Sequence, residues 1–364
     1  MASQIAALNQ FGQSPWYDNL TRSLLLDGGL AKFFSEDDIR GVTSNPTIFE
    51  KAMGTGDVYD EGLAACAEDG LGIEDSYWRL VTEDVASAAD LLRGVYDETG
   101  GADGFVSLEV SPDLAHDTGG TCSQAKELFE DLGRPNVMIK IPATEDGLPA
   151  ITAMIAEGIN VNVTLIFALE RHAQVIDAYL TGLEQLAEKG GDLAKVSSVA
   201  SFFVSRVDTE TDRRLPEGHA LRGKAAVANA KLAYQLFTEQ FSGSRWDALA
   251  AKGARLQRPL WASTSTKNPN YPPTLYVDEL IGKDTVNTLA QASIDALHEG
   301  QATLRVDSVE EDVDGAKATL DALADAGVDF DDVTATLERE GVASFSASFH
   351  DAFNTLEKKR AEVS

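Results

Sequence analysis

The stretch Val137-Met138-Ile139-Lys140-Ile141-Pro142-Ala143-Thr144 predicts a short apolar β-strand that carries one lysine and ends at a proline. Side chains alternate between the two faces of a strand, so Val137, Ile139 and Ile141 share one face and Lys140 lies on the other. Lysine is almost never fully buried without a partner, which leaves two interpretations open. Lys140 either keeps its ammonium group in water on a solvated sheet face, or lies in an interior where burial lowers its pKa. In the second case its neutral amine can attack a carbonyl carbon.

The same alternation recurs along the chain. Strands are predicted at residues 39–46, 105–112, 160–167, 196–204 and 259–267, with a short extended piece at 14–18 and a weaker strand at 285–289. The segments between them have the apolar periodicity of amphipathic helices. Strands that alternate with helices are typical of a parallel sheet.

About eight such units predict an α/β fold, a (β/α)8 TIM barrel, which typically takes about 250 residues. We expect the barrel at about 14–295, with additional N-terminal helices and a C-terminal helical layer at about 296–364. No linker divides the chain, so residues 1–364 are predicted to form a single elaborated domain. Within the C-terminal layer, aromatic and leucine side chains recur at helical spacing and are expected to pack against the body: Phe345, Phe349, Phe353 and Leu356.

Several predicted strands carry polar side chains near their C-terminal ends, on the face opposite the apolar one. In a barrel these residues point inward: Asn45, Glu109, Lys140, Asn162, Thr164, Ser201 and Ser265. Each buried polar group without a partner costs about 1–3 kcal/mol, so plain core filling does not explain them. A functional site at the C-terminal mouth of the barrel does explain these inward-facing polar residues.

A buried lysine among carboxylates, hydroxyls and amides is suited to Schiff-base formation with a ketone or aldehyde. Forming the carbinolamine and losing water both need proton transfers, which Glu109 and Thr164 could relay. Cleavage of a carbon–carbon bond then needs a base for a substrate hydroxyl, and Asp18 is the candidate. An aspartate ahead of a helix more often serves as an N-cap, so the helix-cap interpretation of Asp18 stays open.

Composition excludes several classes of partner. The net charge of −29 argues against nucleic acid and anionic membranes as partners, and an anionic substrate would need a local cluster of cations. No apolar run approaches the length of a membrane span, and the first residues lack the pattern of a signal peptide. Two cysteines are too few for a disulfide framework, so we expect a cytoplasmic protein. The oligomeric state is left open, and a homo-oligomer is compatible with the sequence.

The sequence predicts no metal ion and no other cofactor. The five histidines lie far apart and none has metal-ligand spacing. Residues 218–225 nearly fit a phosphate-binding P-loop, but Ala225 replaces the metal-binding hydroxyl residue and no apolar strand precedes the segment.

The motifs together resemble those of transaldolases, class I aldolase-type (β/α)8 enzymes. The resemblance covers about residues 14–295 and is carried by Gly-Val-Thr-Ser-Asn-Pro (41–46), Ser-Leu-Glu-Val (107–110), Ile-Lys-Ile-Pro-Ala-Thr (139–144), Asn-Val-Thr-Leu-Ile-Phe (162–167) and Ser-Arg-Val-Asp (205–208). It implies transfer of a dihydroxyacetone unit between sugar phosphates in the non-oxidative pentose phosphate pathway. Sedoheptulose 7-phosphate and glyceraldehyde 3-phosphate would give erythrose 4-phosphate and fructose 6-phosphate.

By position in these motifs, the resemblance implies that Lys140 forms the Schiff base and that Asp18 is the general acid/base of the aldol step. It also implies that Glu109 and Thr164 handle the water. The implied substrate-binding residues are Asn45, Asn162 and Ser201 for sugar hydroxyls, and Arg206 and Lys267 for phosphate. Many transaldolases carry arginine where this chain has Lys267, and a lysine binds phosphate as a point charge rather than bidentately.

Two alternatives stay open. A fructose 6-phosphate aldolase uses the same lysine chemistry but releases dihydroxyacetone to water. The greater length of this chain and Phe203, where those aldolases tend to carry tyrosine, favour a transaldolase. A non-catalytic sugar-phosphate-binding barrel explains Arg206 and Lys267 but gives no reason for Lys140 and Glu109.

Overall fold

The computed structural model describes residues 3–363 and contains a closed barrel of parallel strands that pair in chain order, β8 returning to β1. The strands are β1 (Gln13–Tyr17), β2 (Gly41–Thr43), β3 (Phe105–Glu109), β4 (Val137–Pro142), β5 (Val161–Ile166), β6 (Ser198–Phe203), β7 (Gln257–Ala262) and β8 (Thr285–Leu289). The predicted (β/α)8 barrel is therefore confirmed, including the weak strand at 285–289.

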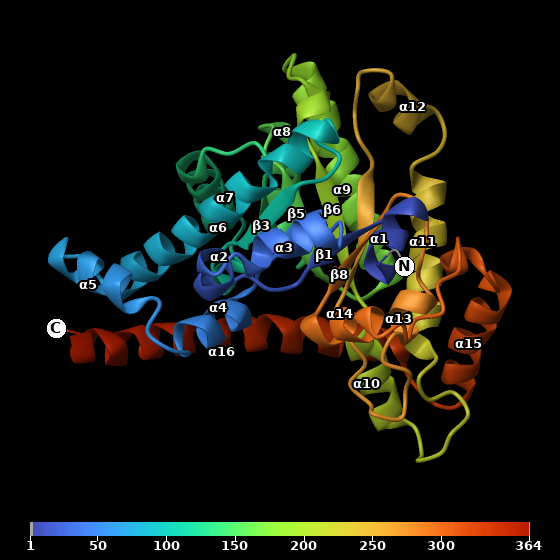
Figure 1. The fold of residues 1–364 in the computed structure, drawn as a ribbon. Helices are drawn as coiled ribbons and strands as arrows, with labels where there is room; N and C mark the ends of the chain where they lie inside the picture. The colour runs from blue at the N-terminus through green and yellow to red at the C-terminus, as the bar shows by residue number, and fades with distance from the viewer. Residues whose placement is uncertain (1–2, 364) are drawn as a thin grey trace.

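Helices surround the barrel and extend from it (Figure 1). They are α1 (Gln4–Gln10), α2 (Arg22–Leu26), α3 (Gly29–Glu36), α4 (Pro46–Met53), α5 (Asp60–Glu68), α6 (Ile73–Glu98), α7 (Thr118–Leu132), α8 (Gly147–Ala156), α9 (Leu169–Glu188), α10 (Ser205–Arg214), α11 (Ala225–Gln240), α12 (Ser244–Ala250), α13 (Leu275–Asp278), α14 (Gln291–His298), α15 (Val313–Asp325) and α16 (Phe330–Val363). Short 3-10 turns are η1 (Pro112–Leu114), η2 (Leu193–Lys195) and η3 (Ser308–Glu310).

The strand register decides which side chains face the interior. Glu109 pairs with Lys140, and Lys140 pairs with Asn162, so these three residues lie at one level on the same face of the sheet. Ser201, on β6, donates a hydrogen bond to Asn162. The polar faces predicted from alternation therefore converge inside the barrel.

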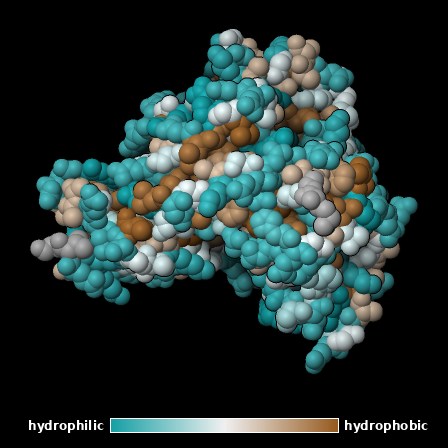
Figure 2. Space-filling view, in the orientation of Figure 1, coloured by the Kyte–Doolittle hydropathy of each residue, from teal (hydrophilic) through white to brown (hydrophobic). Residues whose placement is uncertain are grey.

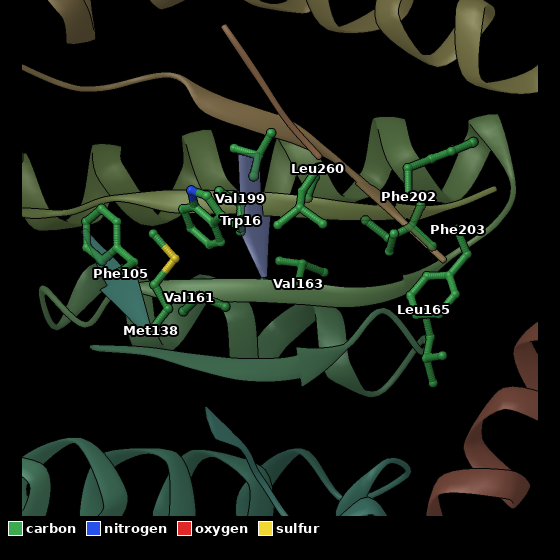
Figure 3. Packing of buried hydrophobic residues seen from close by; sticks show 14 of the residues in the cluster. Trp16, Phe105, Met138, Val161, Val163, Leu165, Val199, Phe202, Phe203 and Leu260 are labelled. Atoms are coloured by element: carbon green, nitrogen blue, oxygen red, sulfur yellow. The ribbon is translucent and has the colours of Figure 1, made fainter. Parts of the chain in front are cut away.

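The opposite, N-terminal half of the interior is apolar. Inward-facing residues nearer the N-terminal ends of the strands carry bulky side chains that pack together in Figure 3: Trp16, Phe105, Met138 and Val199. The rings of Trp16 and Phe105 lie 6.3 Å apart. These closely packed apolar side chains form a hydrophobic plug beneath the polar residues. The plug restricts the movement of Lys140 and its neighbours.

The C-terminal helix α16 lies beside α4 across one end of the barrel, while α12 lies at the other end (Figure 1). The predicted aromatic stripe packs as expected. The Tyr77 ring lies 5.2 Å from Phe349 and 5.3 Å from Phe353, both edge-on. Because α4 begins directly after β2, this packing places α16 over the C-terminal mouth of the barrel.

The face of the molecule seen in Figure 2 is mostly hydrophilic and is crossed by a band of hydrophobic residues. Large hydrophobic side chains that stay exposed are Leu26, Leu91 and Val306. Among residues 3–363, no helix combines the length and apolar character needed to cross a membrane.

Candidate active site

A cavity of about 330 Å³ opens at the C-terminal mouth of the barrel. Residues from β4, β5 and β6 line it together with loops and with α16. Seven of the nine predicted site residues contribute to its wall: Asp18, Asn45, Lys140, Thr164, Ser201, Arg206 and Lys267. The other two, Glu109 and Asn162, lie directly behind that wall, in contact with Lys140 and Ser201 respectively.

Lys140 is buried, with 5% of its surface exposed, so the interpretation as a solvated surface lysine is wrong. Its Nζ atom donates a hydrogen bond of 3.0 Å to the carbonyl oxygen of Ser44. The same atom lies 3.3 Å from Oε2 of Glu109. An amine held in this way on a rigid strand, facing a cavity, has the geometry of a nucleophile for a carbonyl carbon.

Glu109 and Thr164 have unused hydrogen-bonding capacity beside the lysine. Burial raises the pKa of Glu109, and the nearby Lys140 opposes that rise. Apart from the contact with Lys140, neither carboxyl oxygen of Glu109 nor Oγ1 of Thr164 has a hydrogen-bond partner within residues 3–363. A buried acid with a raised pKa is suited to exchanging protons near neutral pH.

An irregular strand end positions Thr164. The pairing of β5 with β6 shifts between Val163 and Ile166, and Leu165 has a φ of +60°, which is unusual for a leucine. Such bulges redirect side chains next to active sites. Here Thr164 faces the cavity, and Leu165 packs so closely against α16 that a Cβ on Gly341 would lie 2.9 Å from it.

Asp18 follows the last residue of β1 and faces the cavity from across the barrel. Thr43 Oγ1 donates a hydrogen bond of 2.8 Å to its carboxylate. Burial raises the pKa of Asp18, while Lys140 and the Thr43 hydrogen bond oppose the rise. Asp18 caps no helix, since the N-cap of α2 is Thr21, so the helix-cap interpretation is wrong.

The amide and hydroxyl residues divide into two layers. Asn45 caps α4 by accepting the Ile48 N–H at 3.0 Å, and it lines the cavity with Ser201. Asn162 instead lies beneath, where Nδ2 donates to Ser107 and Oδ1 accepts from Ser201. It therefore orients Ser201 and does not itself line the cavity.

Arg206 and Lys267 form a cationic side of the cavity. The Arg206 guanidinium lies over Phe203, 5.4 Å from the ring centre, and over Phe345 at 5.9 Å. Burial lowers the pKa of both cations, and the charge of Arg206 lowers the pKa of Lys267 further. Neither forms an ion pair with any residue in 3–363, although acidic residues outnumber basic ones 59 to 30. Unpaired cations of this kind could hold an anion by charge-assisted hydrogen bonds.

Three residues that contribute to the site were not predicted from the sequence to do so. Lys51, at the end of α4, adds a further cation to the cavity wall, and Phe345 on α16 covers Arg206. Thr43, the partner of Asp18, could have been found, because it shares a strand face with Asn45. No local pattern distinguishes Lys51 from a solvated helix lysine.

Comparison with known proteins shows the family to which this chain belongs. Residues 15–356 match the family described as Transaldolase/Fructose-6-phosphate aldolase. A transaldolase of Thermobifida fusca is 50% identical over 366 residues, covering 99% of each chain. Transaldolases of Saccharopolyspora erythraea and Acidothermus cellulolyticus are 49% and 50% identical, over 98% and 100% of this chain and 98% and 99% of theirs. This chain therefore belongs to the transaldolase/fructose-6-phosphate aldolase family of enzymes, and the resemblance to transaldolases is confirmed.

Proposed function

We propose that this enzyme transfers a dihydroxyacetone unit from sedoheptulose 7-phosphate to glyceraldehyde 3-phosphate, giving erythrose 4-phosphate and fructose 6-phosphate in the non-oxidative pentose phosphate pathway. The observation that supports this most is the buried amine of Lys140, which faces a cavity whose opposite side carries unpaired cations. A ketose phosphate would span the cavity, with its carbonyl carbon at Lys140 and its phosphate at the cations.

In the first stage, the Lys140 amine attacks C2 of the ketose and forms a carbinolamine. Glu109 accepts a proton from the amine, and its raised pKa makes it able to return that proton to the departing hydroxyl. Thr164 orients the released water and the water that later hydrolyses the imine. The unused oxygens of Glu109 and Thr164 support this role.

In the second stage, Asp18 takes the proton of the C4 hydroxyl. The C3–C4 bond breaks, its electron pair moves into the iminium as an enamine, and the aldose phosphate leaves. The enamine carbon then attacks the aldehyde carbon of the acceptor, and Asp18 returns the proton to the new hydroxyl. Asp18 follows β1, whereas Glu109 is the last residue of β3, and this separation suits two proton transfers at different carbons.

Substrate recognition follows from the remaining wall residues. Asn45 and Ser201 bind the sugar hydroxyls, with Asn162 fixing Ser201 from below. Arg206 and Lys267 bind the phosphate by charge-assisted hydrogen bonds.

The test is an assay of fructose 6-phosphate cleavage with and without erythrose 4-phosphate. A transferase consumes fructose 6-phosphate only when the acceptor is present, with one sedoheptulose 7-phosphate formed for each glyceraldehyde 3-phosphate released. Rapid cleavage without the acceptor, with free dihydroxyacetone as product, would instead show a fructose 6-phosphate aldolase-like lyase. Binding of the sugar phosphate without turnover in either assay would show a non-catalytic barrel.

A further inference from the structure

The motif Ser-Arg-Val-Asp at 205–208 holds a second buried group that the chemistry above does not use. Arg206 faces the cavity, but Asp208 is buried on another side of α10 and makes no ion pair within residues 3–363. Its carboxylate accepts the Ala226 N–H at 2.8 Å and the Tyr276 hydroxyl at 2.8 Å. A buried carboxylate satisfied by neutral donors alone is costly, so it needs a role in the structure.

One helical turn later, Asp212 repeats the arrangement. Its Oδ2 accepts the hydroxyl of Tyr271 at 2.5 Å, and its Oδ1 accepts the Gly223 N–H at 2.9 Å. The Tyr271 ring lies directly against Gly223, where an added Cβ would be 2.6 Å from the ring. Gly223 also has a φ of +71°, so both space and backbone favour glycine there.

These contacts connect the two segments that carry the phosphate-binding cations. Arg206 stands at the start of α10, ahead of Asp208 and Asp212. Lys267 lies on the loop after β7, followed by Tyr271 and Tyr276. Two tyrosine–aspartate hydrogen bonds therefore hold the Lys267 loop against the helix of Arg206.

A restraint on the Lys267 loop is needed to keep Lys267 close to Arg206. Burial lowers the pKa of Lys267 most, and the charge of Arg206 lowers it further, so the two cations repel each other. Lys267 lies on a proline-rich loop. Apart from a hydrogen bond to Ser265, its ammonium group has no partner within residues 3–363. Without an anchor, the loop would gain entropy and reduce the repulsion by moving Lys267 away from Arg206.

We propose that Tyr271 and Asp212, supported by Tyr276 and Asp208, are positioning residues that hold Lys267 beside Arg206 so that both cations contact one substrate phosphate. This inference rests on the proposed function, because it assumes that Arg206 and Lys267 bind phosphate. According to this proposal, the Lys267 loop contributes to affinity for the phosphate group and does not take part in the chemistry at Lys140.

Tyr271→Phe tests the proposal, since it removes one hydroxyl and keeps the ring against Gly223. We expect the KM for fructose 6-phosphate and the inhibition constant for inorganic phosphate each to rise about fivefold or more, with kcat within about twofold. With fructose as donor and glyceraldehyde as acceptor, both without phosphate, kcat/KM should change by less than about twofold.

Tyr179→Phe is the matched control. The Tyr179 hydroxyl donates 2.8 Å to the carbonyl oxygen of Arg255, and Tyr179 does not line the cavity. Both variants lose one partly buried tyrosine hydrogen bond, so both are expected to lower Tm, but only Tyr271→Phe should weaken phosphate binding. In a Lys267→Met background, Tyr271→Phe should have no further effect on the KM for fructose 6-phosphate, because it acts through Lys267.

The proposal is overturned if Tyr271→Phe leaves the KM and the phosphate inhibition constant unchanged, or if it weakens fructose and fructose 6-phosphate equally. It is also overturned if the effects of Tyr271→Phe and Lys267→Met are additive. A wild-type enzyme that neither prefers fructose 6-phosphate over fructose nor is inhibited by inorganic phosphate would instead contradict the phosphate site itself, and with it the proposed function.

Discussion

The Nζ atom of Lys140 lies 3.3 Å from Oε2 of Glu109, and the two residues are register partners on the adjacent strands β4 and β3. Both side chains are almost fully buried, with 5% and 4% of their surfaces exposed. Because neighbouring strands hold them, the amine and its proposed proton acceptor are already in contact before a carbonyl arrives. In the proposed mechanism, imine formation uses this pair, and bond cleavage depends on a different group, Asp18.

This separation of roles predicts the behaviour of Asp18→Asn. The amide keeps an oxygen that can accept the Thr43 hydroxyl, so the fold should be retained. Loss of the general base should lower kcat about 10²–10⁴-fold, while the imine with fructose 6-phosphate still forms. Steady-state kinetics and borohydride trapping measure the two effects separately. Near-normal turnover would contradict the role of Asp18.

The apolar plug below the site predicts a strong effect at Gly41. A methyl group there would overlap the indole ring of Trp16, which is fully buried. Gly41→Ala should lower the free energy of unfolding by about 1–3 kcal/mol, measured by urea denaturation. Gly94→Ala is the control, because Gly94 lies within α6 near its C-terminal end and nothing is within 4 Å of an added Cβ there. It should be stabilising by about 0.5–1 kcal/mol, and equal effects of the two substitutions would contradict the packing described.

His172 predicts a specific pH dependence of stability. Neither ring nitrogen has a hydrogen-bond partner within residues 3–363, and burial lowers its pKa from 6.5 to about 4. Between these values the unfolded chain binds a proton that the native protein does not, so stability falls as the pH falls. This group alone should cost about 2 kcal/mol between pH 7 and pH 5.

His172→Leu removes that group while keeping a side chain that can pack against Phe202. The variant should be as stable as the wild type at pH 7 and lose about 2 kcal/mol less on going to pH 5. Urea denaturation of both proteins at the two pH values measures the difference. Identical pH dependence of the two proteins would show that His172 is not buried as a neutral ring.

Local patterns in the sequence predict the barrel because strand alternation, helix periodicity and the Pro and Gly stops are each set within a few residues. They also predict the convergence of Lys140 and Thr164, since the C-terminal ends of parallel strands meet at one mouth. The depth of Asn162 was not predictable, because it depends on the stagger between strands. The contact between Phe345 and Arg206 was not predictable either, because it depends on how α16, which is distant in sequence, crosses the barrel.

The most direct test of the account is covalent trapping on Lys140. Borohydride added together with fructose 6-phosphate should inactivate the enzyme and add a reduced three-carbon or six-carbon ketose unit to the peptide that contains Lys140, as measured by mass spectrometry. Borohydride alone should leave activity intact, and Lys140→Met should be inactive and unlabelled. Retained activity after the combined treatment, or an adduct on another lysine with Lys140 unmodified, would contradict the account.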